Sequence, residues 1–178
     1  MMEKSKKSKA REDNVQPAKP VLIFGYGNLS RGDDALGPLL LEYLNDKIDA
    51  NNIEILTDFQ LQVEHALDLE NRQLVLFVDA AVNCESSIQF SRLQAIKDKS
   101  YSTHAISPTA ILQVYQEIIK QPPPPCFLLR IQGISFELGE NLSQQAQKNL
   151  QHAIQFTEDL LATPEINAWN QQQEHCFA

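Results

Sequence analysis

The chain is poor in cysteine and lacks long apolar segments, and each shortage excludes a class of protein. Its 178 residues include three cysteines, Cys84, Cys126 and Cys176, which lie far apart and form no CxxC spacing. This pattern excludes the zinc-ribbon and thioredoxin-like signatures and favours reduced thiols. No segment has the roughly 18 uninterrupted apolar residues of a membrane span, and the first residues lack the apolar core of a secretory signal. We therefore expect a cytoplasmic protein without membrane association.

Positive charge is also scarce. The formal net charge is -8 at pH 7, which argues against a nucleic-acid partner and against binding to anionic membranes. Only residues 1–20 are basic, with six Lys or Arg against three acids, and their composition predicts a disordered tail. Residues 164–178 are rich in glutamine and predict a second polar tail. Residues 21–163 then form one domain, which is long enough to bury its own core.

Short apolar runs alternate with helical patterns along this domain. Four runs are rich in β-branched and aromatic residues and are bounded by turn residues, as buried strands are: residues 21–27, 53–56, 74–81 and 126–133. A weaker alternation over residues 88–93 predicts a fifth strand at an antiparallel edge.

Apolar residues recur at helical spacing in three segments, residues 36–48, 111–119 and 146–161. Ser107 is predicted to cap the second helix, because Pro108 follows it at the first helical position, where a missing N–H costs nothing. A short helix near residues 63–69 would connect the second and third strands in parallel. The alternation predicts an α/β fold, a three-layer αβα sandwich around a mostly parallel, twisted sheet of about five strands.

Acidic residues follow the first three predicted strands. Asp33 and Asp34 come after the first strand, Asp58 after the second, and Asp79 ends the third. Sites in such folds lie outside the carboxyl ends of the strands, so we expect these acids at one rim of the sheet. Asp79 interrupts an otherwise apolar strand and needs either a cation or hydrogen bonds, because a buried unpaired carboxylate is costly.

The pair of aspartates stands where a helix is predicted to begin. One carboxylate can cap the free N–H groups of that helix. Consecutive side chains cannot both point at the same N–H groups, so the second carboxylate is free to face the rim. The field of the helix start keeps a carboxylate ionised, which suits capping and metal coordination alike.

His104 could add a ligand of a different type. It lies three residues before the predicted Ser107 cap, where the positive helix end disfavours imidazolium and leaves a neutral ring able to bind metal. The plain alternative is a loop histidine bonded to backbone. Two carboxylates and one imidazole from three loops would hold a borderline divalent transition ion and leave positions for a partner's ligands. His65 and His152 lie in helical patterns and are interpreted as surface or interfacial residues.

The glycine-rich turn GYGNLS, residues 25–30, is a weak match to a dinucleotide-binding fingerprint. Ser30 stands where the third glycine of G-x-G-x-x-G is required. We interpret Gly25 and Gly27 as residues that let the backbone turn sharply beneath the acids. A nucleotide-binding Rossmann-like module is the less favoured alternative.

These segments together resemble a known family. GYGNLSRGDDALG, residues 25–37, resembles the G-x-G-N-x-x-x-x-D-[DE]-x-x-G opening of the hydrogenase maturation endopeptidases. Residues 74–82 and 102–112 are similar to the second and third signature segments of that family, and residues 133–143 to the stretch before its last helix. The resemblance implies an αβα fold and a peptidase that removes the C-terminal extension of a [NiFe]-hydrogenase large-subunit precursor after nickel insertion.

The resemblance also implies roles for individual residues. Asp34, Asp79 and His104 would recognise the nickel, which the precursor supplies, so no permanent cofactor is expected. Asp34 is the best candidate for a catalytic residue, in an aspartyl-type or metal-assisted hydrolysis. Substrate contacts are expected at Gly27, Asn28 and Asp33.

The sequence departs from the family at two places. The family commonly has glutamate where this chain has Asp34, which is one methylene shorter. Many members also have an Asp-Gly-Gly turn after the second strand, whereas this chain reads TDFQLQVEH over residues 57–65. Asp58, Gln60 and Glu64 are therefore given at most a supporting or peptide-contacting role. The shorter acid leaves open a noncatalytic chaperone that grips the nickel-bearing tail on the same scaffold.

Overall fold

A computed structural model describes residues 17–95 and 106–174. Its five strands form one sheet in the order β2-β1-β3-β5-β4. The strands are β1 (Val21–Tyr26), β2 (Ile53–Asp58), β3 (Leu74–Ala81), β4 (Ile88–Arg92) and β5 (Cys126–Gln132). The helices are α1 (Leu36–Asn45), α2 (Pro108–Ile119), α3 (Gln144–Ala162) and α4 (Ile166–Gln171), with 3-10 turns η1 (Gly32–Ala35), η2 (Val63–Leu69) and η3 (Gln172–Glu174). The predicted sandwich is confirmed.

The central strands are buried on both faces, which explains their continuous apolar sequence. β1 pairs in parallel with β2 on one side and with β3 on the other, and β3 pairs in parallel with β5. β4 is antiparallel to β5, as predicted for the fifth strand. After β1 the chain adds β2 on one side of β1 and then β3 on the other side, so the direction in which strands are added reverses beside β1. Ligand sites of such sheets lie at the carboxyl ends of the strands beside this reversal.

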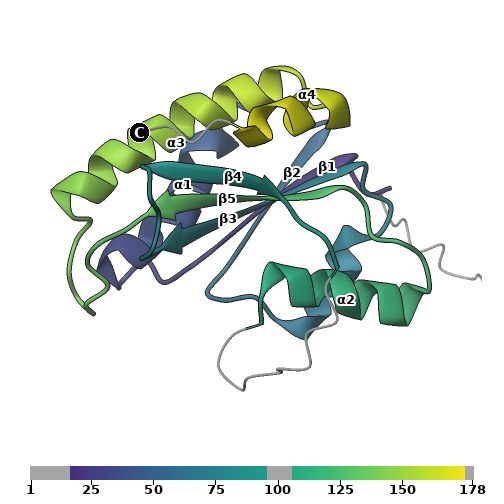
Figure 1. Ribbon diagram of the computed structural model, residues 1–178, viewed down its shortest axis with the longest axis horizontal. Helices are drawn as coiled ribbons and strands as arrows, with labels where there is room; N and C mark the ends of the chain where they lie inside the picture. The colour runs from purple at the N-terminus through teal and green to yellow at the C-terminus, as the bar shows by residue number, and fades with distance from the viewer. Residues whose placement is uncertain (1–16, 96–105, 175–178) are drawn as a thin grey trace, which may run out of the picture.

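Helices cover both faces of the sheet (Figure 1). α1, α3 and α4 pack on one face, and the core there includes Leu36, Leu40 and Phe127. η2 and α2 pack on the other face over Phe24 and Phe77. Burial of these side chains at roughly 25 cal/mol per Å² is the main force that holds the three layers together.

The helix boundaries follow from local chemistry. Ser107 caps α2, as predicted, because its Oγ accepts the Ala110 N–H at 3.2 Å. Ser143 caps α3 in the same way through the Ala146 N–H at 3.1 Å. Lys120 adopts a left-handed conformation and ends α2 before the proline run. The predicted connection at residues 63–69 is a 3-10 helix.

The segment expected to form a polar tail from residue 164 instead packs on the domain up to η3. α4 occupies Ile166–Gln171, and Trp169 within it is 0% exposed. The Trp169 ring lies 5.3 Å from that of Phe127, and its Nε1 donates to the Leu160 carbonyl at 3.0 Å. One large aromatic side chain buries enough apolar surface to hold a short polar helix in place, which a composition argument misses.

Candidate functional site

Two of the predicted ligands, Asp34 and Asp79, meet where the strand order reverses. Asp79 follows five buried residues of β3, and Asp34 lies in η1 after β1. The pairing of Gly25 with Val78 brings Tyr26 and Asp79 to the same level of the sheet. The charge of Asp34 acts on Asp79, so the two carboxylates share one electrostatic environment.

The pKa of Asp79 is raised to about 6. Burial disfavours the charged form and is the largest cause, and the negative charge of Asp34 adds to it. A hydrogen bond from the Tyr26 hydroxyl, the Ala80 N–H and the positive charge of Arg130 limit the shift. Asp79 is therefore ionised at pH 7 but takes up a proton just below neutrality.

Tyr26 and Arg130 complete the surroundings of Asp79. Burial raises the pKa of Tyr26 well above its usual value, and the Asp79 charge raises it further. The hydroxyl therefore stays protonated and donates a hydrogen bond to Asp79. Arg130 stands directly opposite Asp79 in the β3–β5 register. Its Nη1 donates to Gln89 Oε1 at 3.3 Å and its Nη2 to the Asn83 carbonyl at 3.5 Å.

Asp34 is fixed above the glycine-rich turn. Its Oδ2 accepts the Asn28 N–H at 3.0 Å. Gly27 has φ +147°, and a Cβ there would lie 2.0 Å from the Asp34 carbonyl oxygen. Only glycine lets η1 approach the turn this closely, as the interpretation of the turn required.

The same turn has few N–H groups left for a phosphate. Gly27 N–H donates to the Asp58 carbonyl at 3.1 Å, Asn28 N–H to Asp34, and Ser30 N–H to Asn28 Oδ1 at 2.9 Å. A phosphate-binding loop needs these donors free. The arrangement argues against a nucleotide-binding module.

Asp33 ties two loops together and does not face the rim. It is 0% exposed. Its Oδ2 accepts the N–H groups of Ile134 (2.8 Å) and Ser135 (3.0 Å) and the Ser143 hydroxyl (2.8 Å), while Oδ1 accepts the Ser143 N–H (2.7 Å). Burial alone would raise its pKa, but these bonds lower it below the usual value. Its oxygens are occupied inside the fold, which argues against the expectation that Asp33 contacts substrate.

His104 lies outside the described residues. Within residues 17–95 and 106–174, no three His, Cys, Asp or Glu side chains are grouped closely enough to hold a metal ion. The ligand set of Asp34, Asp79 and His104 stays a prediction, of which the structure places two members.

A groove of about 450 Å³ runs beside Asp34. The residues that line it are Gly27, Asn28, Leu29, Ser30, Pro38, Thr57, Asp58 and Phe59. Gly27 and Asn28, two of the predicted substrate contacts, thus line an open space next to Asp34. An extended peptide that enters the groove would pass close to Asp34.

The loop after β2 is fastened by Asp58 and His65. Asp58 Oδ2 lies 3.2 Å from His65 Nε2, and His65 Nδ1 accepts the Gln62 N–H at 2.9 Å. The His65 ring also packs edge-on against Phe24, with centroids 4.6 Å apart. Asp58 supports this loop, and His65, which was predicted as a surface or interfacial residue, has a side chain that is only 15% exposed and braces the loop.

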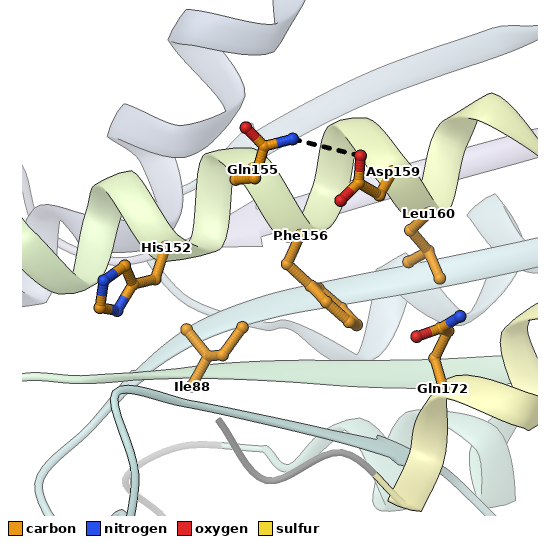
Figure 2. A pocket seen from close by; sticks show the side chains of 7 residues that line it. All are labelled: Ile88, His152, Gln155, Phe156, Asp159, Leu160 and Gln172. Carbon is orange, nitrogen blue, oxygen red and sulfur yellow. Dashed lines mark hydrogen bonds between the residues drawn. The ribbon is translucent and has the colours of Figure 1, made fainter. Parts of the chain in front are cut away.

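A separate cavity of about 370 Å³ lies between α3, β4 and η3 (Figure 2). His152 and Ile88 stand at one end of it and Leu160 and Gln172 at the other, with Phe156 between them. Gln155 Nε2 donates to Asp159 Oδ1 at 3.2 Å along α3. None of the rim residues lines this cavity, so it is not part of the candidate site.

Sequence reasoning did not find Tyr26 and Arg130. A signal existed for Arg130, because it is a cation inside the apolar run of β5. Tyr26 gave a weaker signal as a polar aromatic residue at the end of a buried strand.

No helix in the described part of the chain is both long and apolar enough to cross a membrane.

Comparison with known proteins places the fold. No protein-family model and no functionally curated protein matches the sequence. Among solved structures, the [NiFe] hydrogenase maturation protease HycI from Thermococcus kodakarensis matches with TM-score 0.62 and 23% identity, over 82% of this chain and 94% of that one. The maturating endopeptidase HybD from E. coli matches with TM-score 0.63 and 22% identity, over 80% and 91%.

A third structure, the hydrogenase 2 maturation peptidase from Thaumarchaeota archaeon SCGC_AB-539-E09, matches with TM-score 0.59 and 21% identity, over 81% of this chain and 99% of that one. The chain therefore has the fold of the hydrogenase maturation proteases along about four fifths of its length.

Proposed function

We propose that this protein is an endopeptidase that removes the C-terminal extension of a [NiFe]-hydrogenase large-subunit precursor once nickel has been inserted. The observation that carries the proposal is the meeting of Asp34 and Asp79 at the reversal point of a maturation-protease fold. These are the positions that the motif resemblance assigns to nickel recognition.

Hydrogen bonds hold both carboxylates in place, and both carboxylates can still accept further bonds. Asp34 uses Oδ2 for the Asn28 N–H, and no donor in the described part of the chain bonds its Oδ1. Tyr26 donates one bond to Asp79. Carboxylate oxygens oriented in this way suit a divalent cation that arrives with the substrate. His104 would add an imidazole, and a precursor without nickel would lack the ion that joins it to the enzyme.

The chemistry is the addition of water to a peptide bond. The water oxygen bonds to the scissile carbonyl carbon while a carboxylate takes the water proton, and the C–N bond then breaks as the proton passes to the leaving amine. Asp34, beside the groove, is our candidate for the base. Asp79 is a second candidate, because a pKa of about 6 lies near the working pH and makes an efficient proton acceptor.

Covalent catalysis by cysteine has little support. Cys84 is buried, and burial raises the pKa of its thiol, which lowers the share of reactive thiolate. The proposed hydrolysis therefore uses a rim carboxylate and a water molecule, and not a thiol nucleophile, on the nickel-loaded precursor.

Mass spectrometry of a nickel-loaded precursor after incubation with the protein tests the proposal. We expect the precursor to lose its C-terminal extension and the extension to appear as a separate peptide. A complex in which the precursor keeps its full mass would identify a chaperone and overturn the peptidase. An Asp46→Asn variant, which changes an exposed acid at the far end of α1, serves as the control and should cut normally.

A further inference from the structure

Exposed apolar side chains gather at the carboxyl ends of the strands. Among the described residues, eight large apolar side chains are exposed; five of them lie in the loops that follow β1, β2, β3 and β5, and a sixth, Val63, begins η2 directly after the loop that follows β2. We call these six the apolar ring: Leu29, Phe59, Val63, Val82, Ile134 and Leu138. They come from the same loops that carry or flank Asp34 and Asp79. Apolar side chains gathered on one face of a protein mark an interaction surface.

The ring is exposed although its loops are firmly held. Ile134 and Leu138 belong to the loop before α3, where Asp33 binds the Ile134 N–H and Gly139 N–H donates to the Ser30 carbonyl at 2.7 Å. Arg31 Nε donates to the Phe136 carbonyl in the same loop at 2.7 Å. Leu138 is nevertheless 76% exposed. A surface that is already ordered loses little conformational entropy when a partner binds.

The loop after β2 is likewise held by hydrogen bonds while it exposes an apolar side chain. The Asp58–His65 pair and the Gln62 N–H bond fix it, while Phe59 beside them is 62% exposed. Leu29 lines the same groove as Phe59 and is 63% exposed. The fold thus holds apolar side chains outward around the two carboxylates.

Charge indicates which occupant fits. A two-fold dimer through this face would bring the carboxylates of one copy against those of the other, which is unfavourable. The net charge of -8 likewise disfavours an anionic membrane. The complementary partner has an apolar surface around a cationic centre.

We propose that the apolar ring binds the folded body of the hydrogenase precursor, next to the nickel-bearing segment that the carboxylates recognise. This inference rests on the proposed function and adds a second recognition surface to it. Apolar contacts of this kind are made equally in the ground state and the transition state, so they lower KM and leave kcat nearly unchanged.

The test measures steady-state cleavage of the nickel-loaded precursor by two double variants, Leu29→Ser/Phe59→Ser and Ile134→Ser/Leu138→Ser. We expect each to raise KM about tenfold with a small change in kcat, as for central interface residues. Ile118→Ser is the control, because Ile118 is 56% exposed but lies near the end of α2 that leads into the amino end of β5. Thermal unfolding should show all three variants folded.

The outcomes separate this inference from the proposed function. Unchanged KM in both double variants, with an active wild type, would overturn the ring as a docking surface. If the wild type cuts nothing, size-exclusion chromatography of the same variants with the precursor decides, and the ring is supported if only the double variants lose the complex. A self-association of this chain that the double variants abolish would assign the ring to a second copy and overturn the proposal.

Discussion

Asp33 should contribute to stability far more than an ordinary helix-capping residue. Its carboxylate accepts four hydrogen bonds, at 2.7 to 3.0 Å, from Ile134, Ser135 and Ser143. These donors belong to the segment from the end of β5 to the start of α3, so the side chain ties η1 to that segment. We expect Asp33→Ala to leave three N–H groups without an acceptor.

The magnitude follows from the groups left behind. Each stranded buried donor costs about 1–3 kcal/mol, and partial hydration lowers the sum, so we expect Asp33→Ala to reduce the free energy of unfolding by about 3–5 kcal/mol. In Asp33→Asn, the amide oxygen can replace Oδ2 and keep three bonds. The amide nitrogen then faces the Ser143 N–H, and the loss is about 1–3 kcal/mol.

Urea denaturation at pH 7 measures both losses. The pKa of Asp33 is lowered in the folded state, so its stabilisation is complete above the unfolded value of 3.8 and is lost as the pH falls through the folded pKa. The difference between wild type and Asp33→Asn should therefore be constant from pH 5 to 8, within about 0.5 kcal/mol, and shrink below pH 4. An alanine variant as stable as the wild type at pH 7 would show that the four hydrogen bonds of Asp33 do not stabilise the fold.

Three further changes test other parts of the structure. Asp79→Asn should raise the free energy of unfolding at pH 7 by up to about 3 kcal/mol, because the folded-state pKa of about 6 makes the wild type lose stability as the pH rises from 4 to 6. Urea curves at pH 4 and 7 check this. A difference in stability between the two proteins that stays as large at pH 4 as at pH 7 would contradict it. Gly27→Ala should abolish cleavage and lower the free energy of unfolding by more than about 2 kcal/mol. Gly139 is also at positive φ, but a Cβ there would meet nothing within 4 Å, so Gly139→Ala should lower the free energy of unfolding by about 1–2 kcal/mol and cut normally. Equal losses of stability in the two variants would rule out the steric argument. Trp169→Ala should cost about 3–5 kcal/mol in thermal or urea unfolding, and a loss near zero would show that α4 is not anchored.

The strands and the main helices could be predicted because their patterns are local. β1 and β3 read as continuous apolar runs since both of their faces are covered, and Ser107 with Pro108 fixes the start of α2. α4 could not be predicted in this way. Its composition is polar, and its position depends on one contact set around Trp169 with distant parts of the chain.

Part of the candidate site was predictable too, because it depends on where the locally patterned strands end. The position of Asp34 and Asp79 at one rim follows from the parallel direction of the strands, which the alternation of strands and helices in the sequence predicts. The separate roles of Asp33 and Asp34 do not follow, because η1 sends one carboxylate inward to the loop before α3 and the other to the turn at Asn28. Helix-start preferences are the same for both residues.

In the proposed function, Asp34 and Asp79 together bind the cation that the precursor carries. A gel assay, in which cleavage appears as a mobility shift, compares nickel-loaded with nickel-free precursor for wild type, Asp34→Asn, Asp79→Asn and the control Asp46→Asn. We predict that wild type and control cut only the loaded precursor and that both rim variants cut neither form. Equal cleavage of the two forms by the wild type, or full activity of either rim variant, would contradict the claim.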